Sequence, residues 1–185
     1  MKSSKISDIA EIQWWVYVRS RKGKDLSLLN ANNFDERWIL KDELIPSLTL
    51  RDCPPQHVLQ ENDILLVTKG SRFLASIYKS IYWPCVASTA FLVLRVKEKN
   101  IIPDYLAILM NEALHSSYFK NRTRGTSLPS IQRRDVAEYR ISIPSIEKQQ
   151  TIIEIFNEHK LQTKIYNNLT EKKHSLIHSI ILSSS

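Results

Sequence analysis

The chain has 185 residues, of which 43% are hydrophobic and 24% are charged, and this balance is typical of a globular protein rather than a disordered one. Its best apolar run, residues 85–94, is only ten residues long, whereas a membrane-spanning helix needs about 20. The formal net charge of +7 favours a polyanionic partner such as nucleic acid.

The first half of the chain predicts strands separated by irregular loops. Residues 6–18 are rich in β-branched and aromatic side chains and predict a strand. Residues 25–60 predict irregular structure that includes a Pro-rich loop. Two further strands are predicted, one at residues 63–67 and a longer, largely buried one at residues 86–96.

The second half predicts helices and one strand. Pro103 suits the first turn of a helix that runs to Phe119, in which apolar residues recur at three- and four-residue spacing. This apolar face consists of Tyr105, Leu106, Leu109, Met110, Ala113 and Leu114. A short helix at 133–139 and a strand at 140–143 follow. Together the elements predict an α+β fold, in which a globular domain with a mixed or antiparallel sheet precedes one long C-terminal coiled-coil helix.

The long helix is predicted because no Pro or Gly occurs from Ser145 to Leu182, and about 38 helical residues would extend about 57 Å. A heptad frame places nine residues on one seam: Ile152, Ile155, His159, Gln162, Tyr166, Leu169, Lys173, Leu176 and Ile180. Nothing else in the chain could cover such a helix, so we predict that it pairs with another helix, with the polar seam residues fixing the register. The chain is thereby divided into a domain at 1–144 and a dimerisation helix at 145–185. The alternative is a terminal helix folded back on its own domain.

Basic residues gather in three windows, at residues 19–24, 69–72 and 120–134, which we call the first, second and third basic windows. They hold 11 of the 26 Lys and Arg residues, one glycine each, and no Asp or Glu. Glycine lets a backbone approach a ligand closely or adopt positive φ, while hydroxyls, amides and guanidinium groups bind phosphate oxygens. We interpret the windows as one shared surface for a polyanion; the alternative is three solvated turns. The candidate residues are Arg19, Arg21, Lys22, Lys24, Lys69, Arg72, Lys120, Arg122, Arg124, Thr126 and Ser127.

The sequence lacks the patterns of enzymes that act on nucleic acids. It has no G-x-G-x-x-G motif and no P-loop, and Cys53 and His57 have no further metal ligands near them in the sequence. We therefore predict no catalytic residues, no metal and no cofactor. The two lone cysteines favour reduced thiols, and the first residues lack a secretory signal, so we expect a cytoplasmic protein with no membrane partner.

Four segments carry a family resemblance when they are taken together and in order. These are ISDIAEI, LQENDILLVTKGS, IIPDYLAILMNEALHSSYF and RGTSLPSIQRRDVAEYRISIPSIEKQQTI. The second is similar to a Gly-Asp-Ile-Leu strand with a glycine turn, the third to a Pro-x-Tyr-Leu-x-x-x-Leu segment, and the fourth to a stretch ending in Ile-Pro-x-x-x-x-Glu-Gln. Covering most of residues 5–155, they resemble the target-recognition domain of specificity (S) subunits of type I restriction-modification systems.

The chain departs from the pattern of that family in several places. Ser7 and Asn62 stand where glycine is common, and Ser145 with Ile146 replaces the Pro-Pro of the linker. Family members usually carry two recognition domains and two long helices that pair antiparallel, whereas this chain has one of each. We expect a complete half-length product, because the chain starts with Met and stops after one helix.

The resemblance implies a non-catalytic DNA-recognition subunit. Two copies would pair their helices as a homodimer and read a split palindromic site on double-stranded DNA. The helices would also dock methyltransferase subunits and, through them, restriction subunits. Two alternatives remain: a stand-alone DNA-binding regulatory or accessory protein, and a protein-interaction scaffold that does not bind DNA.

Overall fold

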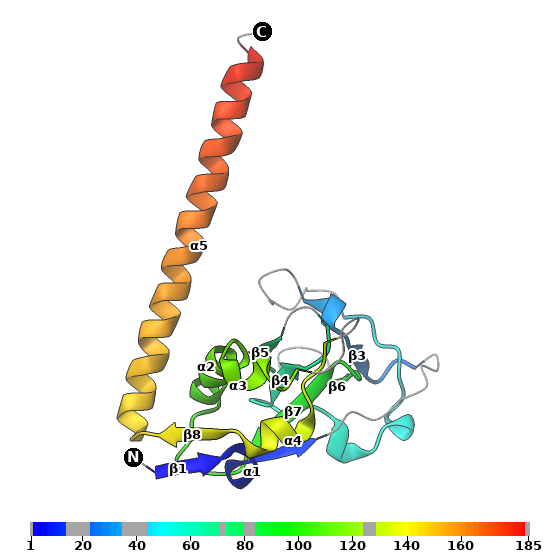
Figure 1. The fold of residues 1–185 in the computed structure, drawn as a ribbon. Coiled ribbons are helices and arrows are strands. Elements are labelled where there is room, and N and C mark those ends of the chain that lie inside the picture. Colours follow the sequence, from blue (N-terminus) through cyan, green and yellow to red (C-terminus); the bar gives the residue numbers. More distant parts are fainter. Residues whose placement is uncertain are drawn as a thin grey trace.

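The computed structural model describes residues 2–13, 23–34, 44–70, 73–79, 84–123 and 129–183. A body of strands and short helices is followed by one long helix that projects away from it (Figure 1). The strands are β1 (Lys2–Lys5), β2 (Ala10–Gln13), β3 (Ser27–Leu29), β4 (Ile64–Val67), β5 (Leu74–Ile77), β6 (Cys85–Ala87), β7 (Phe91–Val96) and β8 (Arg140–Ile143). The helices are α1 (Ile6–Ile9), α2 (Pro103–Leu114), α3 (Ser117–Lys120), α4 (Arg133–Glu138) and α5 (Ile146–Ser183), with short 3-10 turns at Ala31–Asn33, Leu50–Asp52 and Pro55–His57.

The centre of the body is a four-stranded antiparallel sheet in the order β2-β7-β4-β5. Residues of β4 alternate between two cores: Ile64 and Leu66 face one that is shared with α2, while Leu65 and Val67 face a second core on the other side. Both faces of the sheet are therefore buried, which explains why its middle strands are continuous apolar runs. With β1 antiparallel to β8 and β3 parallel to β6, the predicted α+β fold with mixed and antiparallel pairing is confirmed.

Two strand predictions need correction. The run at 86–96 is two strands, because a turn in which the Phe91 N–H donates to the Ser88 carbonyl (3.1 Å) separates β6 from β7. Since both strands are buried, the apolar pattern hides this turn. The run at 6–18 begins as α1 and becomes a strand only at Ala10; residues 14–18 of this prediction lie outside the described part of the chain.

The predicted apolar face of α2 is confirmed. Its buried residues include Tyr105, Leu106, Met110, Ala113 and Leu114, and Leu109 packs half-buried against the same core. The helix nevertheless ends at Leu114, and α3 forms after a break. Because Phe119 of α3 reaches the same core as α2, the apolar pattern continues across the break and predicts one helix where there are two.

The predicted C-terminal helix is confirmed as α5. Its first turns pack on α2, where Ile152, Ile153 and Phe156 are half-buried. Every residue from Asn157 to Leu182 is exposed, and the helix points away from the body (Figure 1). The alternative in which it folds back on its own domain is therefore wrong.

Cys53 and Cys85 are both buried and form no disulfide. Burial raises the pKa of the Cys85 thiol to about 11, which leaves little of the reactive thiolate near neutral pH. No helix among the described residues is long and apolar enough to cross a bilayer.

Candidate nucleic-acid interface

The topology of the central sheet brings the end of the strand before the second basic window to the same end of the sheet as the end of β2. β2 and β4 both run antiparallel to β7, so they run parallel to each other and finish at the same end. β4 finishes at Val67, two residues before Lys69. β2 finishes at Gln13, and residues 14–22, which include the start of the first window, lie outside the described part of the chain. We call this end, where β2 and β4 finish, the basic end of the sheet.

The second basic window and the last part of the third, residues 129–134, lie side by side at the basic end. The Gly70 N–H donates to the carbonyl of Pro129 (3.0 Å). The next pair along, Lys69 and Ser130, forms an isolated antiparallel bridge. Residues that are about 60 positions apart in the sequence are thus joined backbone to backbone, as the hypothesis of a shared surface requires.

The last residues of the third window also contact the strands themselves. The Ile131 N–H donates to the carbonyl of Thr68 (2.9 Å), at the exit of β4. The Arg133 Nε–H donates to the carbonyl of Ile12 (3.2 Å), one residue before β2 ends. Arg133 was not among the predicted binding residues, yet it ties the third window to the strand that leads to the first.

The three glycines do different things. Gly70 has φ of +107° and open space around it, so the turn of the second window needs glycine for its backbone conformation. A Cβ at Gly23 would overlap the backbone of Leu48 and Thr49. The hypothesis that Gly23 lets a ligand approach is therefore wrong, because its own chain occupies that space. Gly125 lies outside the described residues.

The described basic candidates fall into two groups. The side chains of Lys24, Lys69 and Lys120 belong to exposed residues. Arg122 is exposed as well, but its guanidinium stacks 3.8 Å over the Tyr118 ring and donates to the Tyr118 carbonyl (3.2 Å), a contact that orients a cation over an aromatic face. Its Nε also lies 4.0 Å from Asp135 Oδ1. The remaining candidates, Arg19, Arg21, Lys22, Arg72, Arg124, Thr126 and Ser127, lie outside the described part of the chain.

A buried ion pair joins β4 to β7 at the end of the sheet opposite to the basic end. Arg95 of β7 donates to both carboxylate oxygens of Asp63 (2.8 and 2.7 Å), and Asp63 also accepts from the Gln60 N–H (2.8 Å). The hydrogen bond with Asp63 is the main cause that raises the pKa of Arg95, so this guanidinium stays charged. Asp63 is the aspartate in the segment LQENDILLVTKGS, and its ion pair with Arg95 joins β4 to β7.

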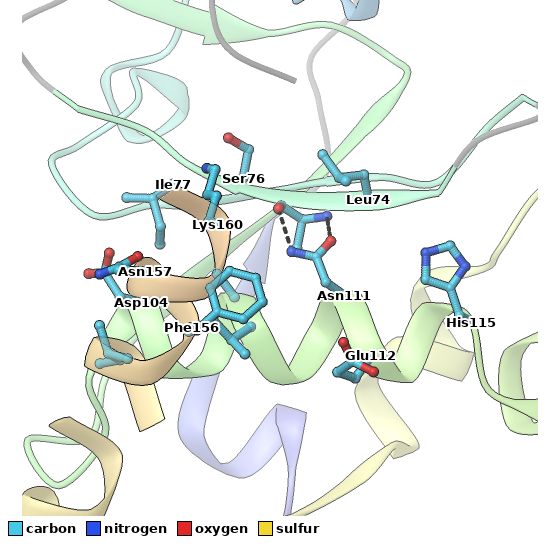
Figure 2. Close-up of a pocket in the computed structure, with 14 residues that line it drawn as sticks. Leu74, Ser76, Ile77, Asp104, Asn111, Glu112, His115, Phe156, Asn157 and Lys160 are labelled. Atoms are coloured by element: carbon cyan, nitrogen blue, oxygen red, sulfur yellow. Dashed lines mark hydrogen bonds between the residues drawn. The ribbon is translucent and has the colours of Figure 1, made fainter. Parts of the chain in front are cut away.

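Two cavities lie elsewhere and carry carboxylates. The first, of about 470 Å³, lies between β5, α2 and the start of α5 and includes Asp104 and Glu112 (Figure 2). The second, of about 530 Å³, includes Asp8, Glu98 and Glu147. Carboxylates disfavour a phosphate ligand, so the basic end of the sheet is the better candidate for a polyanion. Within the described ranges, no three His, Cys, Asp or Glu side chains are grouped to hold a metal ion.

The fold and the basic end together describe an α+β binding module with a projecting helix. The family of type I restriction modification DNA specificity domains matches residues 1–173, and the chain belongs to this family. The resemblance inferred from the sequence is thereby confirmed.

Individual relatives agree with this family. The chain is 30% identical over 105 residues to the type I restriction enzyme MjaVIII specificity subunit of Methanocaldococcus jannaschii, covering 55% of this chain and 23% of that protein. Its fold is similar to the HsdS subunit from Thermoanaerobacter tengcongensis, with a TM-score of 0.61, 16% identity, and coverage of 91% of this chain and 44% of that one. Its fold is also similar to a chain solved in a study of complex assembly and conformational transition of the type I R-M system. The TM-score is 0.55 and the identity 14%, and the match covers 87% of this chain and 38% of that one. The chain thus spans less than half the length of these relatives.

Proposed function

We propose that this chain is a half-length specificity subunit, which recognises double-stranded DNA for a type I restriction-modification complex and carries out no catalysis itself. It would consist of a target-recognition domain at 1–144 and a spacer helix at 145–185, need no cofactor of its own, and act in the cytoplasm. The observation that carries the proposal is the junction of the second and third basic windows at the basic end of the sheet.

Phosphate contacts are proposed for the exposed lysines of this surface, Lys69 and Lys120, with the other residues of the three windows completing it. Backbone-bonded turns hold basic side chains at fixed positions, and such contacts position a protein on the duplex without reading its sequence. Arg122, stacked on Tyr118, presents a planar fork whose remaining donors suit a phosphate. Phosphate or base contacts are proposed for the first window, because it lies within residues 13–58, which none of the four segments that carry the family resemblance covers.

A homodimer is proposed from the orientation of the heptad seam. At about 100° per residue, the residues of α5 that face the body, such as Gln149 and Phe156, lie on the side opposite to Leu169 and Leu176. Seam residues from Ile155 onward are exposed, whereas Ile152 is half-buried at the body. Because the body covers the seam only at Ile152, a second copy is the partner that the exposed seam residues from Ile155 onward would fit.

The polar seam residues favour antiparallel over parallel pairing. In a parallel homodimer Lys173 would face Lys173 of the second copy, and like charges at a seam position are unfavourable. In an antiparallel pair that matches each a position with a d position, Lys173 faces Gln162, His159 faces Leu176, and Tyr166 faces Leu169. The amide oxygen of Gln162 can then accept from the Lys173 ammonium group.

A symmetric dimer reads a symmetric target. Two recognition domains related by a two-fold axis would each contact half of a palindromic, split DNA site. The length of α5 would set the separation of the half-sites at about one DNA turn or somewhat more, at ~34 Å per turn. The exposed faces of α5 outside the seam, which include Leu161 and Ile165, are the surface proposed to dock methyltransferase subunits and, through them, restriction subunits.

Salt-dependent duplex binding tests the interface. The logarithm of the binding constant should fall with the logarithm of salt concentration by about 0.9 per phosphate contact. Replacing Lys69 and Arg72 by Ala should reduce this slope by about 1.8 per domain. The matched control, Lys164→Ala with Lys172→Ala, removes the same charge from α5 and should leave the slope unchanged in fluorescence anisotropy titrations.

Other outcomes would redirect the proposal. A wild-type chain that binds no duplex DNA at moderate salt would overturn DNA recognition and favour a protein scaffold. Equal slopes for the two double variants would remove the second window from the interface. Light scattering of the purified chain checks the homodimer independently, since a monomer at micromolar concentration contradicts it.

A further inference from the structure

One buried polar side chain joins α5 to the body. Gln149, near the start of the helix, is 0% exposed. Its Oε1 accepts from the Ile102 N–H (2.9 Å), and its Nε2 donates to the carbonyls of Asn100 (2.8 Å) and Pro144 (3.0 Å). The amide thus bonds both the loop that enters α2 and the turn that enters α5. The three bonds together need one acceptor and one donor group, and the glutamine amide supplies both.

Apolar packing at the same place is incomplete. Phe156 and Ile153 of α5 line the open cavity of about 470 Å³ that separates the helix from β5 and part of α2 (Figure 2). A space of this size leaves room for the helix to tilt unless something else holds it, because van der Waals contacts fall off steeply with small gaps. Gln149 is a directional contact at the base of the helix, and buried hydrogen bonds are costly to break.

A small tilt at the base has a large effect at the far end. The 38 residues of α5 extend about 57 Å, so a rotation of about 10° moves the tip by about 10 Å. In a dimer the two tilts add, and the distance between the two recognition surfaces changes by a substantial part of a DNA turn. A spacer of defined length therefore also needs a defined angle.

We infer that Gln149 is a positioning residue, which fixes the angle of α5 to the body and thereby the separation of half-sites that the dimer accepts. The inference rests on the proposed function for its DNA consequence, but the angle itself is a property of the free protein. Gln149 touches no DNA in this arrangement; it acts through the direction of the helix.

Binding to a series of split sites tests the DNA consequence. Wild-type protein should prefer one spacer length, with affinity falling at least tenfold when a few base pairs are added or removed. Gln149→Met keeps the length of the side chain but loses all three bonds, and should flatten this preference while the affinity for a single half-site stays the same. Gln150→Met, at the exposed neighbouring position, is the matched control and should keep the wild-type profile. A folded Gln149→Met protein with the wild-type spacer profile would overturn the inference.

Pulsed electron spin resonance tests the angle without DNA. Spin labels on Glu11→Cys in β2 and Lys164→Cys in α5, both exposed positions, report the body-to-helix distance, since Cys53 and Cys85 are buried. An excess of unlabelled chain removes distances between copies. The wild-type distribution should be narrow and that of Gln149→Met, or of Gln149→Glu if the first variant does not fold, should be clearly wider.

The two tests can disprove the positioning role and the proposed function independently of each other. A broad distribution in the wild-type protein overturns the positioning role, whatever the variants do. A narrow distribution that widens in the variant supports it even if the protein binds no duplex DNA, and in that case it is the proposed function that fails.

Discussion

Apolar side chains are buried in the body but exposed in the distal part of α5, residues 157–182. In the body, two cores cover both faces of the central sheet, and the buried charge of Asp63 is matched by Arg95. In the distal helix every residue is exposed, including Leu161, Ile165, Tyr166, Leu169, Leu176, Ile177, Ile180, Ile181 and Leu182. The body buries its apolar side chains within its own cores, whereas a helix with such an exposed apolar surface would be stabilised by pairing with another surface.

The largest expected effect is on the helix side of this comparison. Leu169→Asp puts a charge into the proposed central layer, opposite Tyr166, and does so twice in a symmetric dimer. Losing the burial of a Leu costs about 1.5–3 kcal/mol, so two should weaken the dimer by about 3–6 kcal/mol, or about 10²–10⁴-fold. Sedimentation equilibrium measures the dissociation constant.

The matched control is Leu161→Asp. Leu161 is 58% exposed and Leu169 is 53% exposed, so the two changes are alike in the monomer, but Leu161 lies outside the seam. If both variants weaken the dimer equally, the seam is wrong. If neither does, the helix does not pair through its heptads.

The next largest effect is expected for the buried ion pair that stabilises the body. Asp63→Ala leaves the Arg95 guanidinium without its bidentate partner, and breaking a buried pair in this way costs about 3–5 kcal/mol. Glu61→Ala removes only one end of an exposed pair with Lys79 (3.9 Å) and should cost less than about 1 kcal/mol. Urea denaturation gives both free energies of unfolding, and similar values would show that the buried pair does not stabilise the sheet.

A smaller effect is expected at the turn before β4. Asn62 has φ of +69°, in the left-handed region that favours glycine, and the resemblance places it where the family commonly has glycine. Asn62→Ala should destabilise the body by about 1 kcal/mol. Asn62→Gly should be close to neutral, because it relieves the backbone but loses the bond that Asn62 accepts from Lys79 (3.1 Å). Thermal unfolding compares the two, and equal losses would point to the side-chain bond alone.

The smallest effect is a pH dependence on the surface of the body. Lys5 of β1 donates to Glu138 of α4 (2.6 Å), and this hydrogen bond is the main cause that lowers the pKa of Glu138 from its ordinary value of 4.5. A lowered pKa in the folded state adds stability above the unfolded value, which is lost as the pH falls through the folded value. Glu138→Gln should therefore be less stable than wild type near neutral pH, and the difference should vanish in acid. A constant difference in urea midpoints across that pH range would exclude the ion pair as its cause.

The sequence predicted the parts of the fold that depend on local patterns. The absence of Pro and Gly after Pro144 and the heptad spacing were enough to predict α5, and periodic apolar residues were enough for the face of α2. The same patterns could not show the turn between β6 and β7 or the break between α2 and α3. In both places the flanking residues are buried in cores, so the apolar pattern continues across the irregularity.

The sequence could predict which residue types form the candidate site, but not which of them lie together in the fold. Counting charges identified the three basic windows, and their sequence also suggested that the glycines serve a ligand. For Gly23 this is wrong, because the contact that requires glycine comes from Leu48, which no local pattern connects with it. Arg133 and Gln149 were missed for the same reason, since their partners Ile12, Ile102 and Asn100 are remote in the sequence.

The sequence by itself determined the family, the existence of the long helix and the clustering of positive charge along the chain, because each of these depends on residues that are close together in the sequence. Only the tertiary structure decided that the second window meets the end of the third, that β2 and β4 finish at one end, and that Gln149 at the base of α5 bonds the loop before α2. These features depend on the strand order and on contacts between residues that are remote in the sequence. A backbone bond such as that between Gly70 and Pro129 forms only after folding has brought these two residues together.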